Sequence, residues 1–526
     1  MSLPRLLFQC SLGYLLVFVV FKWHQLRRAL AQIGYHPGSR TLFGFSPVLG
    51  NILPYIPYIS LGRDHWWRTK YQVFKKLGSE IYGGVSVFPT GSHFMLADSA
   101  AVKRVSYTHN SFVKNTEYYK IAKEFGSNLL VVEGEEWKRQ RRIAAPAFSD
   151  KNNRLVWDTA KGFVEQGINT WETNKPTIIH DVRKDFTSQL SLCIIAKAAF
   201  GQDISVGNDA ITTGHKLSFR DALLTASKSL HLPLILPSWA WKLREGWSQA
   251  KQAHDELRLY LREMIAARRE LKQQQIQELL DRKYDLFNQL IYARDVDDML
   301  TEDELIGNVF LFLLGGHETS ASTFAIILSL LALYPEVQNK LVKQLQQLEH
   351  EHGALNYGHF HLLTYAMAVV YETLRLFPLV GLLPKKATAD TTVTVGFPPH
   401  TRTIQVPAST MVNISPIGLH YSPNYWESPE DFDPERFMDP HWNRDAFIPF
   451  SLGPRACIGR RFAETALVAQ IATFITKYEV SIDESRFKFI EGESILERRT
   501  RLINPQVQLA LSPAPISLVF SLRDPN

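Results

Sequence analysis

The sequence predicts a mainly α-helical fold with small β-sheets, of the α+β class. From about residue 44 to residue 300, apolar residues recur mainly at helical spacing, interrupted by short β-like stretches near 81–98. A long apolar stretch over 308–333 has the length of a helix, and β-like, turn-rich segments follow Pro378 before a last apolar helix over 458–478. With 526 residues, of which 45% are hydrophobic, the chain can bury a large core.

The first thirty residues differ from the rest of the chain. Residues 6–21 are almost unbroken apolar sequence, which is short of the roughly 20 residues that a membrane span needs. A cleaved signal peptide is the alternative, because Ala29-Leu30-Ala31 resembles a cleavage site. The stretch KWHQLRR separates that site from the apolar run, which is the wrong layout for cleavage, and its basic charges favour a cytosolic side for the rest of the chain. We therefore predict a single-pass signal-anchor and flank over 1–34 and one catalytic domain over 35–526.

Cysteine usage and charge limit the function classes. The three cysteines at 10, 193 and 457 are too far apart in sequence to suggest a disulfide framework or a zinc cluster, and their scarcity suits a reducing compartment. The formal charge of +6 is mildly basic, and the basic residues are interleaved with 52 acidic ones. No stripe for nucleic acid is present, so we expect no nucleic-acid partner.

The apolar stretch over 308–333 contains Gly315-Gly316-His317-Glu318-Thr319 at its centre. An ionisable cluster at this place would be costly in lipid, so we predict a buried core helix and not a second membrane span. Each glycine weakens a helix by about 1 kcal/mol relative to alanine. The glycines would also let something flat and bulky approach the backbone.

Cys457 lies where a loop turns into a helix, so the first free N–H groups of that helix point near its sulfur. Such a position predicts a lowered thiol pKa. Gly453 and Gly459 let the backbone fold tightly around the sulfur, and Arg455 adds positive charge. One thiolate without a His or Cys partner is a poor zinc site but a suitable axial ligand for haem iron. A buried structural cysteine and a nucleophile are the alternatives that this stretch leaves open.

Five motifs resemble those of the cytochrome P-450 family and follow that family's order. They are Trp137-x-x-x-Arg141, Gly315-Gly316-His317-Glu318-Thr319, Glu372-x-x-Arg375, Pro434-Glu435-Arg436-Phe437 and Phe450-x-x-Gly453-x-Arg455-x-Cys457-x-Gly459. In the family these are the WxxxR helix, the oxygen-activation motif, the ExxR helix, the meander motif and the haem-binding signature. Each is weak alone, but together they cover the chain from about 40 to its end and resemble fungal microsomal members.

The resemblance implies the cytochrome P-450 fold, with haem b between a long central helix and a C-terminal loop that supplies Cys457 as the iron's thiolate ligand. Trp137, Arg141 and Arg455 are suitable donors to the haem propionates. The basic residue that such families place after the ExxR helix has Lys385 or Lys386 as its only candidates here. The cofactor-binding residues implied are Trp137, Arg141, Arg455, Phe450, Gly453, Gly459 and Lys385. Glu372, Arg375 and Arg436 would form a structural network supporting the cysteine loop.

On the other side of the haem, the resemblance makes Glu318 and Thr319 the catalytic pair. Thr319 would donate a hydrogen bond to the oxygen being activated, and Glu318 would relay protons from solvent. Relatives that rearrange peroxides commonly lack this pair, so its presence favours a true monooxygenase. The substrate pocket implied is mainly apolar: Phe125, Leu129, Leu130, Phe312, Gly315, Gly316, Val380 and Leu382. We expect hydroxylation or epoxidation of a lipophilic small molecule, a terpenoid of secondary metabolism, with fatty acids, xenobiotics and aromatics as alternatives.

Electrons must come from another protein, because the sequence has no flavin or nicotinamide fingerprint and no ferredoxin-type cysteine set. The resemblance implies NADPH-cytochrome P-450 reductase, an FAD/FMN flavoprotein of the endoplasmic reticulum membrane, with cytochrome b5 as a second donor. Basic residues on two segments would dock it: Lys138, Arg139, Arg142, Arg460 and Arg461. The alternatives of another class are a non-catalytic haem sensor or carrier, and a structural membrane protein without haem.

Overall fold

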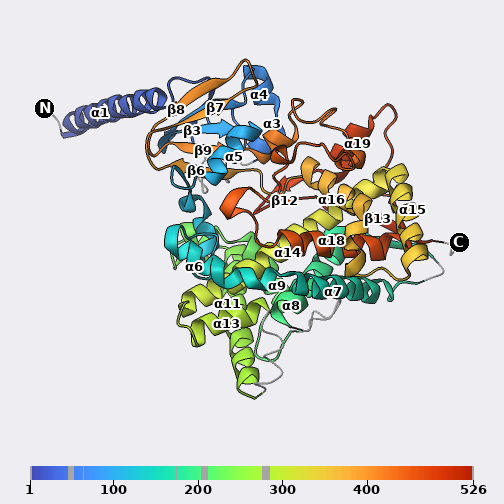
Figure 1. Ribbon diagram of the computed structural model, residues 1–526. Coiled ribbons are helices and arrows are strands. Elements are labelled where there is room, and N and C mark those ends of the chain that lie inside the picture. The colour runs from blue at the N-terminus through green and yellow to red at the C-terminus, as the bar shows by residue number, and fades with distance from the viewer. Residues whose placement is uncertain are drawn as a thin grey trace. The chain divides into compact units, whose positions relative to one another are not determined.

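The computed structural model describes residues 3–44, 53–62, 64–172, 175–202, 211–274 and 285–523. The chain divides into two compact units, and Figure 1 labels many of their elements. Unit 1 combines 1–118, 380–429 and 443–456, and unit 2 combines 119–379, 430–442 and 457–526. Helices dominate and the β-sheets are small, so the predicted fold class is confirmed.

Unit 1 is built on a six-stranded mixed sheet with strand order β1-β2-β3-β9-β6-β4. Its strands are β1 (Gly38–Phe43), β2 (Ile81–Phe88), β3 (Thr90–Leu96), β4 (Phe112–Lys114), β6 (Leu383–Ala387) and β9 (Met411–Ile414). β7 (Thr391–Val395) and β8 (Arg402–Val406) form a separate two-stranded hairpin. The helices are α3 (His65–Thr69), α4 (Gln72–Leu77), α5 (Ser99–Tyr107) and α17 (Pro416–His420), and the 3-10 turns are η7 (Arg444–Ala446) and η8 (Gly453–Arg455). Phe94, Val412 and Ile414 are fully buried and form part of the core of this unit.

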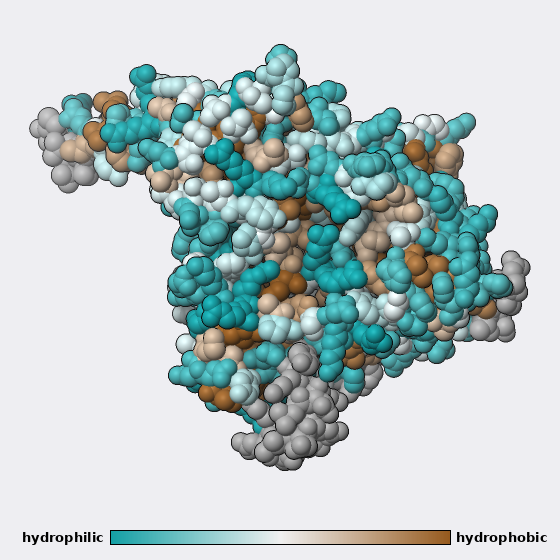
Figure 2. Space-filling view, in the orientation of Figure 1, coloured by the Kyte–Doolittle hydropathy of each residue, from teal (hydrophilic) through white to brown (hydrophobic). Residues whose placement is uncertain are grey.

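The N-terminal helix α1 (Leu3–Gln32) belongs to unit 1 and has two dissimilar parts. Apolar side chains of its middle, such as Leu16 and Val19, are exposed, and brown patches mark this helix in Figure 2. Its C-terminal end lies against the sheet, where the Gln32 amide donates to Thr410 Oγ1 at 3.1 Å and accepts from Ser92 Oγ at 2.9 Å. The helix that begins with the apolar run therefore continues without a break into a segment that is packed on the sheet.

Unit 2 surrounds the long helix α14 (Glu302–Leu333), which packs against α8, α16 and β10 (Figure 1). Its other helices are α6 (Gly134–Ala144), α7 (Asp150–Ile168), α8 (Ser188–Phe200), α9 (Phe219–Lys228), α10 (Leu232–Ile235), α11 (Glu245–Gln274), α13 (Leu286–Asp295), α15 (Pro335–His352), α16 (Thr364–Leu376), α18 (Arg460–Ile475) and α19 (Ile495–Ile503). Short 3-10 or π turns are η1 (Thr116–Lys123, which begins in unit 1), η2 (Ala145–Phe148), η3 (Arg183–Thr187), η4 (Ala240–Lys242), η5 (Tyr357–Leu362) and η6 (Pro434–Phe437). Two small sheets complete it, β10 (Tyr478–Ile482), β13 (Leu518–Leu522) and β5 (Thr177–Ile179) in one, and β11 (Gln506–Val507) and β12 (Leu511–Ser512) in the other.

Helix α14 begins with a capping box. The Thr301 hydroxyl accepts from the Glu304 backbone N–H at 3.2 Å, and the Glu304 carboxylate accepts from the Thr301 N–H at 2.9 Å, which satisfies two N–H groups that the helix itself cannot. Within the described ranges, α14 is the single helix long and apolar enough to cross a membrane, but 72% of its apolar window is buried in the protein. The prediction of a buried core helix is confirmed.

Candidate functional site

The cysteine loop ends at Gly459, which precedes the first turn of α18. Cys457 is exposed, in contrast to the buried Cys193, yet enough protein surrounds its sulfur that burial raises the pKa of the thiol. A hydrogen bond from the Gly459 N–H and the charges of Arg141 and Arg460 oppose this rise without cancelling it. The prediction of a lowered thiol pKa is therefore wrong for the protein alone, because desolvation outweighs the helix terminus.

Arg141 and Trp137 lie four residues apart on α6, so they share a face of that helix. The Arg141 guanidinium carbon lies 5.9 Å from the centroid of the Trp137 ring. The Arg141 charge acts on the Cys457 sulfur and lowers its pKa, which brings the helix bearing both donors to the cysteine. Two motifs that lie far apart in the sequence thus meet at one thiol.

A different face of α6 fixes this helix to α14. The Gln140 amide donates to Glu304 Oε1 at 3.0 Å and accepts from the Asn308 amide at 3.0 Å. Arg139 also donates to the Glu304 carboxylate and to the Met299 carbonyl. Because Glu304 caps α14, these bonds fix the position of α6, which carries Trp137 and Arg141, relative to the start of the central helix.

Phe148 connects the cysteine loop to the middle of α14. A Cβ atom on Gly459 would lie 3.6 Å from the Phe148 ring, and that ring lies 5.7 Å from the Phe312 ring, centroid to centroid. Phe312 precedes Gly315 by about one helical turn. One aromatic side chain therefore touches both the thiol loop and the helix that carries the predicted oxygen-activation residues.

The two adjacent glycines of α14 have different surroundings. A Cβ atom on Gly315 would meet nothing within 4 Å, and this residue is exposed although most of the helix is buried. A Cβ atom on Gly316 would lie 2.7 Å from Ile195 Cδ1 of α8. We correct the prediction that both glycines open the helix to a ligand, because Gly316 serves the close packing of α14 on α8. Leu311, Gly315 and Thr319 form one less buried stripe at four-residue spacing.

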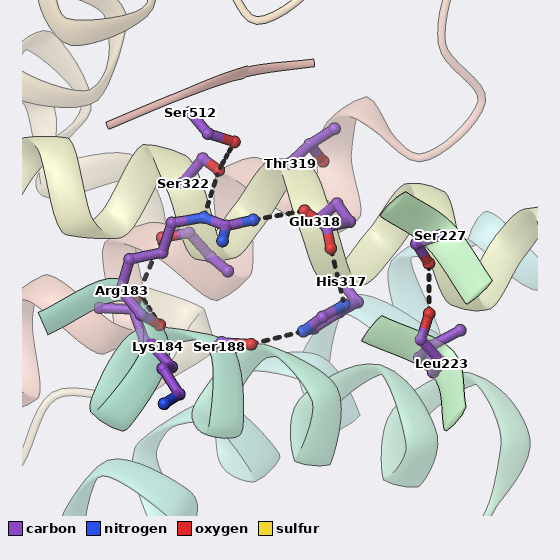
Figure 3. Close-up of polar contacts among 12 residues, drawn as sticks. Arg183, Lys184, Ser188, Leu223, Ser227, His317, Glu318, Thr319, Ser322 and Ser512 are labelled. Carbon is purple, nitrogen blue, oxygen red and sulfur yellow. Dashed lines mark hydrogen bonds and ion pairs between the residues drawn. The ribbon is translucent and has the colours of Figure 1, made fainter. Parts of the chain in front are cut away.

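Glu318 and Thr319 follow this opening (Figure 3). The Thr319 hydroxyl donates to the Gly315 carbonyl at 2.7 Å, which places it on the stripe beside the opening. The Glu318 carboxylate accepts from the Arg183 Nη2 group of η3, and each of these side chains is 13% exposed. Arg183 was missed by sequence reasoning, because 135 residues separate the partners and no local pattern marks it.

His317, for which the sequence offered no role, is completely buried. Its Nε2 atom lies 2.9 Å from the Ser188 hydroxyl of α8, and its Nδ1 atom lies 4.0 Å from the Glu318 carboxylate (Figure 3). Burial lowers the pKa of His317, and the nearby Arg183 and Arg220 charges lower it further, although Glu318 and Ser188 act in the opposite direction. The neutral imidazole joins α14 to α8 next to the ion pair.

The predicted structural network comes together around Glu372. Its carboxylate accepts from Arg375 Nε at 2.7 Å, from Arg375 Nη2 at 2.7 Å, from Arg436 Nε at 3.1 Å and from the Asp433 N–H at 2.9 Å. Arg375 also donates to the Asp431 carbonyl at 3.0 Å. Glu372 and Arg375 are both fully buried, so this network is closed to solvent.

The remaining predicted residues of unit 2 lie in the segment before α6. Phe125 is buried and its ring lies 4.3 Å from Phe310 of α14 and 5.5 Å from His254 of α11. Leu129 is buried, and its N–H donates to Asn308 at 3.0 Å, while the adjacent Leu130 is half-buried. The Phe125 contacts are those of a core side chain, so its place in a substrate pocket stays a prediction.

Several predicted residues belong to unit 1. Gly453 has φ of +73°, and a Cβ atom there would lie 2.6 Å from the Ser106 carbonyl, so only glycine fits this turn. Phe450 and Arg455 are half-buried on either side of it. Lys385 is buried in β6 while the adjacent Lys386 is exposed on the opposite face. Leu382 is part of the core of unit 1, whereas Val380 is 40% exposed.

The basic residues expected to dock a reductase are already engaged within unit 2. Arg139 pairs with Glu304, Arg460 with Glu464 at 2.8 Å, and Lys138 with Glu135 at 2.7 Å. Arg461 stands 4.0 Å over the Phe360 ring. Arg139 is therefore corrected to a structural ion pair, because its guanidinium faces α14. Lys138, Arg142, Arg460 and Arg461 keep enough exposure to meet a partner.

Comparisons with known proteins show the family to which the chain belongs. The sequence model of the cytochrome P450 family matches residues 47–505. The chain is 37% identical over 528 residues to "Cytochrome P450 monooxygenase 124" of Postia placenta, covering 97% of this chain and 98% of the relative. It is 28% identical to "Cytochrome P450 monooxygenase ORF6" of Penicillium roqueforti over 80% of this chain and 79% of the relative, and 26% identical to "Cytochrome P450 3A29" of Sus scrofa over 84% and 85%. The chain therefore belongs to the cytochrome P450 family, whose cofactor is haem, and is a cytochrome P450 monooxygenase.

Proposed function

We propose that the protein inserts one oxygen atom of O2 into a lipophilic small molecule with NADPH as the source of electrons. The balanced reaction is RH + O2 + NADPH + H⁺ → ROH + H2O + NADP⁺. The observation that carries this proposal is the arrangement around Phe148 in unit 2. The Phe148 ring lies next to Gly459 of the cysteine loop and 5.7 Å from the ring of Phe312, which precedes the open Gly315 by about one turn of α14.

The donor set fits a haem held by Cys457. Cys457 is exposed as a residue, and the Gly459 N–H with the Arg141 charge stabilises the ionised form of its thiol. Because burial raises the thiol pKa, the rest of this stabilisation would come from an iron held by Cys457. Trp137 and Arg141 would bind the propionates, and Arg455 and Lys385 stay predicted donors. When bound, a haem with a thiolate ligand supplies O–O cleavage.

Proton delivery is proposed for Glu318 and Thr319. Thr319 lies on the stripe with Gly315 and can pass a hydrogen bond to a ligand in the opening. Glu318 is partly exposed, so it can exchange a proton with solvent. Its ion pair with Arg183 occupies the carboxylate. A proton can be taken up and passed on only when that pair loosens.

A partner flavoprotein would supply the electrons. We propose NADPH-cytochrome P450 reductase, with cytochrome b5 as a second donor, docking on the exposed basic residues Lys138, Arg142, Arg460 and Arg461. We further propose that α1, although its apolar run over 6–21 is shorter than a full span, anchors the protein in the endoplasmic reticulum membrane and leaves residues 35–526 in the cytosol. The exposed apolar side chains along the middle of α1 support this location (Figure 2).

The substrate class follows from the lining of the opening. Leu311 and Phe312 are apolar neighbours of Gly315, so apolar surface is favoured there over charge. We propose a terpenoid as the first class to test, and fatty acids and polycyclic aromatics as the next. An anchored enzyme would meet such molecules where they partition into the membrane.

The decisive experiment is the carbon monoxide difference spectrum of the reduced protein, recorded beside Cys457→His. A Soret band strongly red-shifted from that of nitrogen-ligated haem, and lost in this variant, is the expected result. Cys193→Ala is the matched control and keeps the band, because Cys193 is buried in α8. A haem-loaded wild type without the band, or a band that persists in Cys457→His, would overturn the ligand assignment.

A further inference from the structure

A series of polar contacts leads from the C-terminal hairpin of unit 2 to the catalytic carboxylate (Figure 3). The Ser512 hydroxyl of β12 lies 3.2 Å from the Ser322 hydroxyl of α14. Arg183 Nε donates to that same Ser322 oxygen at 3.1 Å. Arg183 Nη2 then donates to Glu318. Four side chains from β12, α14 and η3 are thereby joined.

The donors and acceptors make Ser322 the junction of this series. A hydroxyl has one proton to donate and two lone pairs to accept with. Ser322 accepts from Arg183 and still has its proton and a second lone pair for Ser512, whichever of the two hydroxyls donates. Ser512 thus completes the bonding of the group that holds the Arg183 side chain in place.

Burial makes this junction sensitive to loss of either hydroxyl. Ser322 is fully buried and Ser512 is 3% exposed. A buried guanidinium N–H without an acceptor is costly, and a fixed Nε also fixes the plane in which Nη2 reaches Glu318. The two serines therefore hold Arg183 in the orientation that pairs it with Glu318.

The hairpin itself is a short element that contacts α14 at Ser322. It has two residue pairs, Gln506–Ser512 and Val507–Leu511, and the Leu511 N–H also donates to the Leu379 carbonyl at 2.9 Å, whereas Leu509 at its tip is 46% exposed. Ser322 follows Gly315 by seven residues, so the two share a face of α14 about 10 Å apart along the helix axis. A lipophilic molecule seated over Gly315 can span that distance and reach the hairpin.

We propose that Ser512 and Ser322 are positioning residues that couple substrate occupancy to proton delivery. Without substrate the hairpin keeps Arg183 on Glu318, and a substrate that displaces the hairpin releases this hold and frees the carboxylate to take up and pass on a proton. The inference rests on the proposed function of Glu318. If the two serines act in this way, loss of the Ser322 or the Ser512 hydroxyl allows NADPH oxidation without substrate, by O2 + NADPH + H⁺ → H2O2 + NADP⁺.

The test uses the full-length, haem-loaded enzyme with a fungal NADPH-cytochrome P450 reductase. NADPH oxidation and peroxide release are measured without substrate in wild type, Ser322→Ala, Ser512→Ala and the double variant. We expect both rates to rise about fivefold in each single variant, which corresponds to one lost hydrogen bond. The double variant should exceed neither single variant, because both act through Arg183. Ser512→Thr, which keeps the hydroxyl, should restore the wild-type rates.

Ser329→Ala is the matched control. Ser329 is fully buried on the same helix, and its hydroxyl donates to the Ala325 carbonyl at 2.7 Å, away from Arg183. We expect unchanged NADPH oxidation and peroxide release in this variant. Unchanged rates in both Ser322→Ala and Ser512→Ala, additive effects in the double variant, or an equal rise in Ser329→Ala would overturn the proposal.

Hydrogen–deuterium exchange separates this proposal from the proposed function. In the haem-loaded protein without reductase, Ser512→Ala should speed the exchange of amides in 183–187 as well as in 506–512. Faster exchange confined to the hairpin would contradict the linkage, whatever the activity. A wild type without the thiolate band in its carbon monoxide spectrum would instead contradict the proposed function, and the exchange data would still decide whether the hairpin acts on Arg183.

Discussion

The Glu372–Arg375 pair and the Glu318–Arg183 pair are both carboxylate–guanidinium pairs in unit 2, and they differ in how completely protein encloses them. Glu372 and Arg375 have no exposed side-chain surface, and the carboxylate accepts four hydrogen bonds from three residues. Glu318 and Arg183 are each 13% exposed, and Glu318 lies on the helix that carries the opening at Gly315. The first arrangement suits a fixed support, whereas the second allows the carboxylate to change partners.

The largest expected difference between the two pairs is in stability. Arg375→Ala leaves a buried carboxylate without its main partner and should lower the free energy of unfolding by about 3–5 kcal/mol. We expect haem-free protein from this variant. Arg183→Ala should cost less than Arg375→Ala and retain haem, because Glu318 keeps 13% exposure and can be partly hydrated, whereas Glu372 has none. Denaturant titration and haem quantification measure both.

Arg436→Lys is a second variant that tests the fully buried Glu372–Arg375 pair. Arg436 donates to Glu372 through Nε, which lysine lacks, although the charge is kept. An intermediate loss of haem would show that the bonds of the network matter beyond its charge. Normal haem content in Arg375→Ala, or equal destabilisation by Arg375→Ala and Arg183→Ala, would remove the distinction between the two pairs.

A substitution at Gly316 tests the packing of α14 on α8 next to the Glu318–Arg183 pair. Gly316→Ala directs a methyl group at Ile195 Cδ1, where the separation is only 2.7 Å. We expect a loss of about 1–3 kcal/mol from overpacking, partly offset by the better helix propensity of alanine. Thermal or denaturant unfolding measures this loss. In an Ile195→Ala background the loss caused by Gly316→Ala should be much smaller, since the effects of contacting residues are not additive, and an equal loss in both backgrounds would contradict the contact.

The contrast between these regions also shows what sequence can predict. The Cys457 loop, the Glu372–Arg375 spacing and the fold class follow from local patterns, and the helix over 308–333 follows from its apolar length and its ionisable centre. The raised pKa of Cys457 does not, because burial is set by the whole unit. Arg183 was not predictable for the same reason, since only the packing of η3 on α14 brings it to Glu318.

The adjacent glycines make the same point at single-residue scale. Gly315 and Gly316 share one local sequence context, yet one meets open space and the other meets α8. The sequence predicted that the glycines admit a bulky group, which fits Gly315. It could not predict that Ile195, more than a hundred residues earlier, would occupy the space next to Gly316.

His317, which lies beside the Glu318–Arg183 pair, should make the stability of the protein depend on pH. Burial lowers its pKa below the ordinary value of 6.5, so the folded state binds its proton less readily than the unfolded state does. The contribution of neutral His317 to the free energy of unfolding is therefore fully present above about pH 6.5. It decreases as the pH falls below that value, by at most about 1.4 kcal/mol per pH unit for one proton. Denaturant titrations between pH 7.5 and 5.5 should show a smaller decrease in His317→Gln. An identical decrease in both proteins would mean that His317 does not stay neutral.

The smallest expected change in stability comes from Gly315→Ala, and its direction is opposite to that of Gly316→Ala. The added methyl meets no atom within 4 Å, so the higher helix propensity of alanine should stabilise the protein by about 0.5–1 kcal/mol. The same methyl occupies space that a ligand over α14 would use. With dodecanoic acid as a lipophilic probe, the spectral dissociation constant should rise while unfolding moves to higher denaturant. A destabilised variant would show that the space is already filled, whereas a stabilised variant with unchanged probe binding would place the ligand elsewhere. A gain in stability together with a loss of binding would tie the exposure of one glycine in a buried helix to the use of the site.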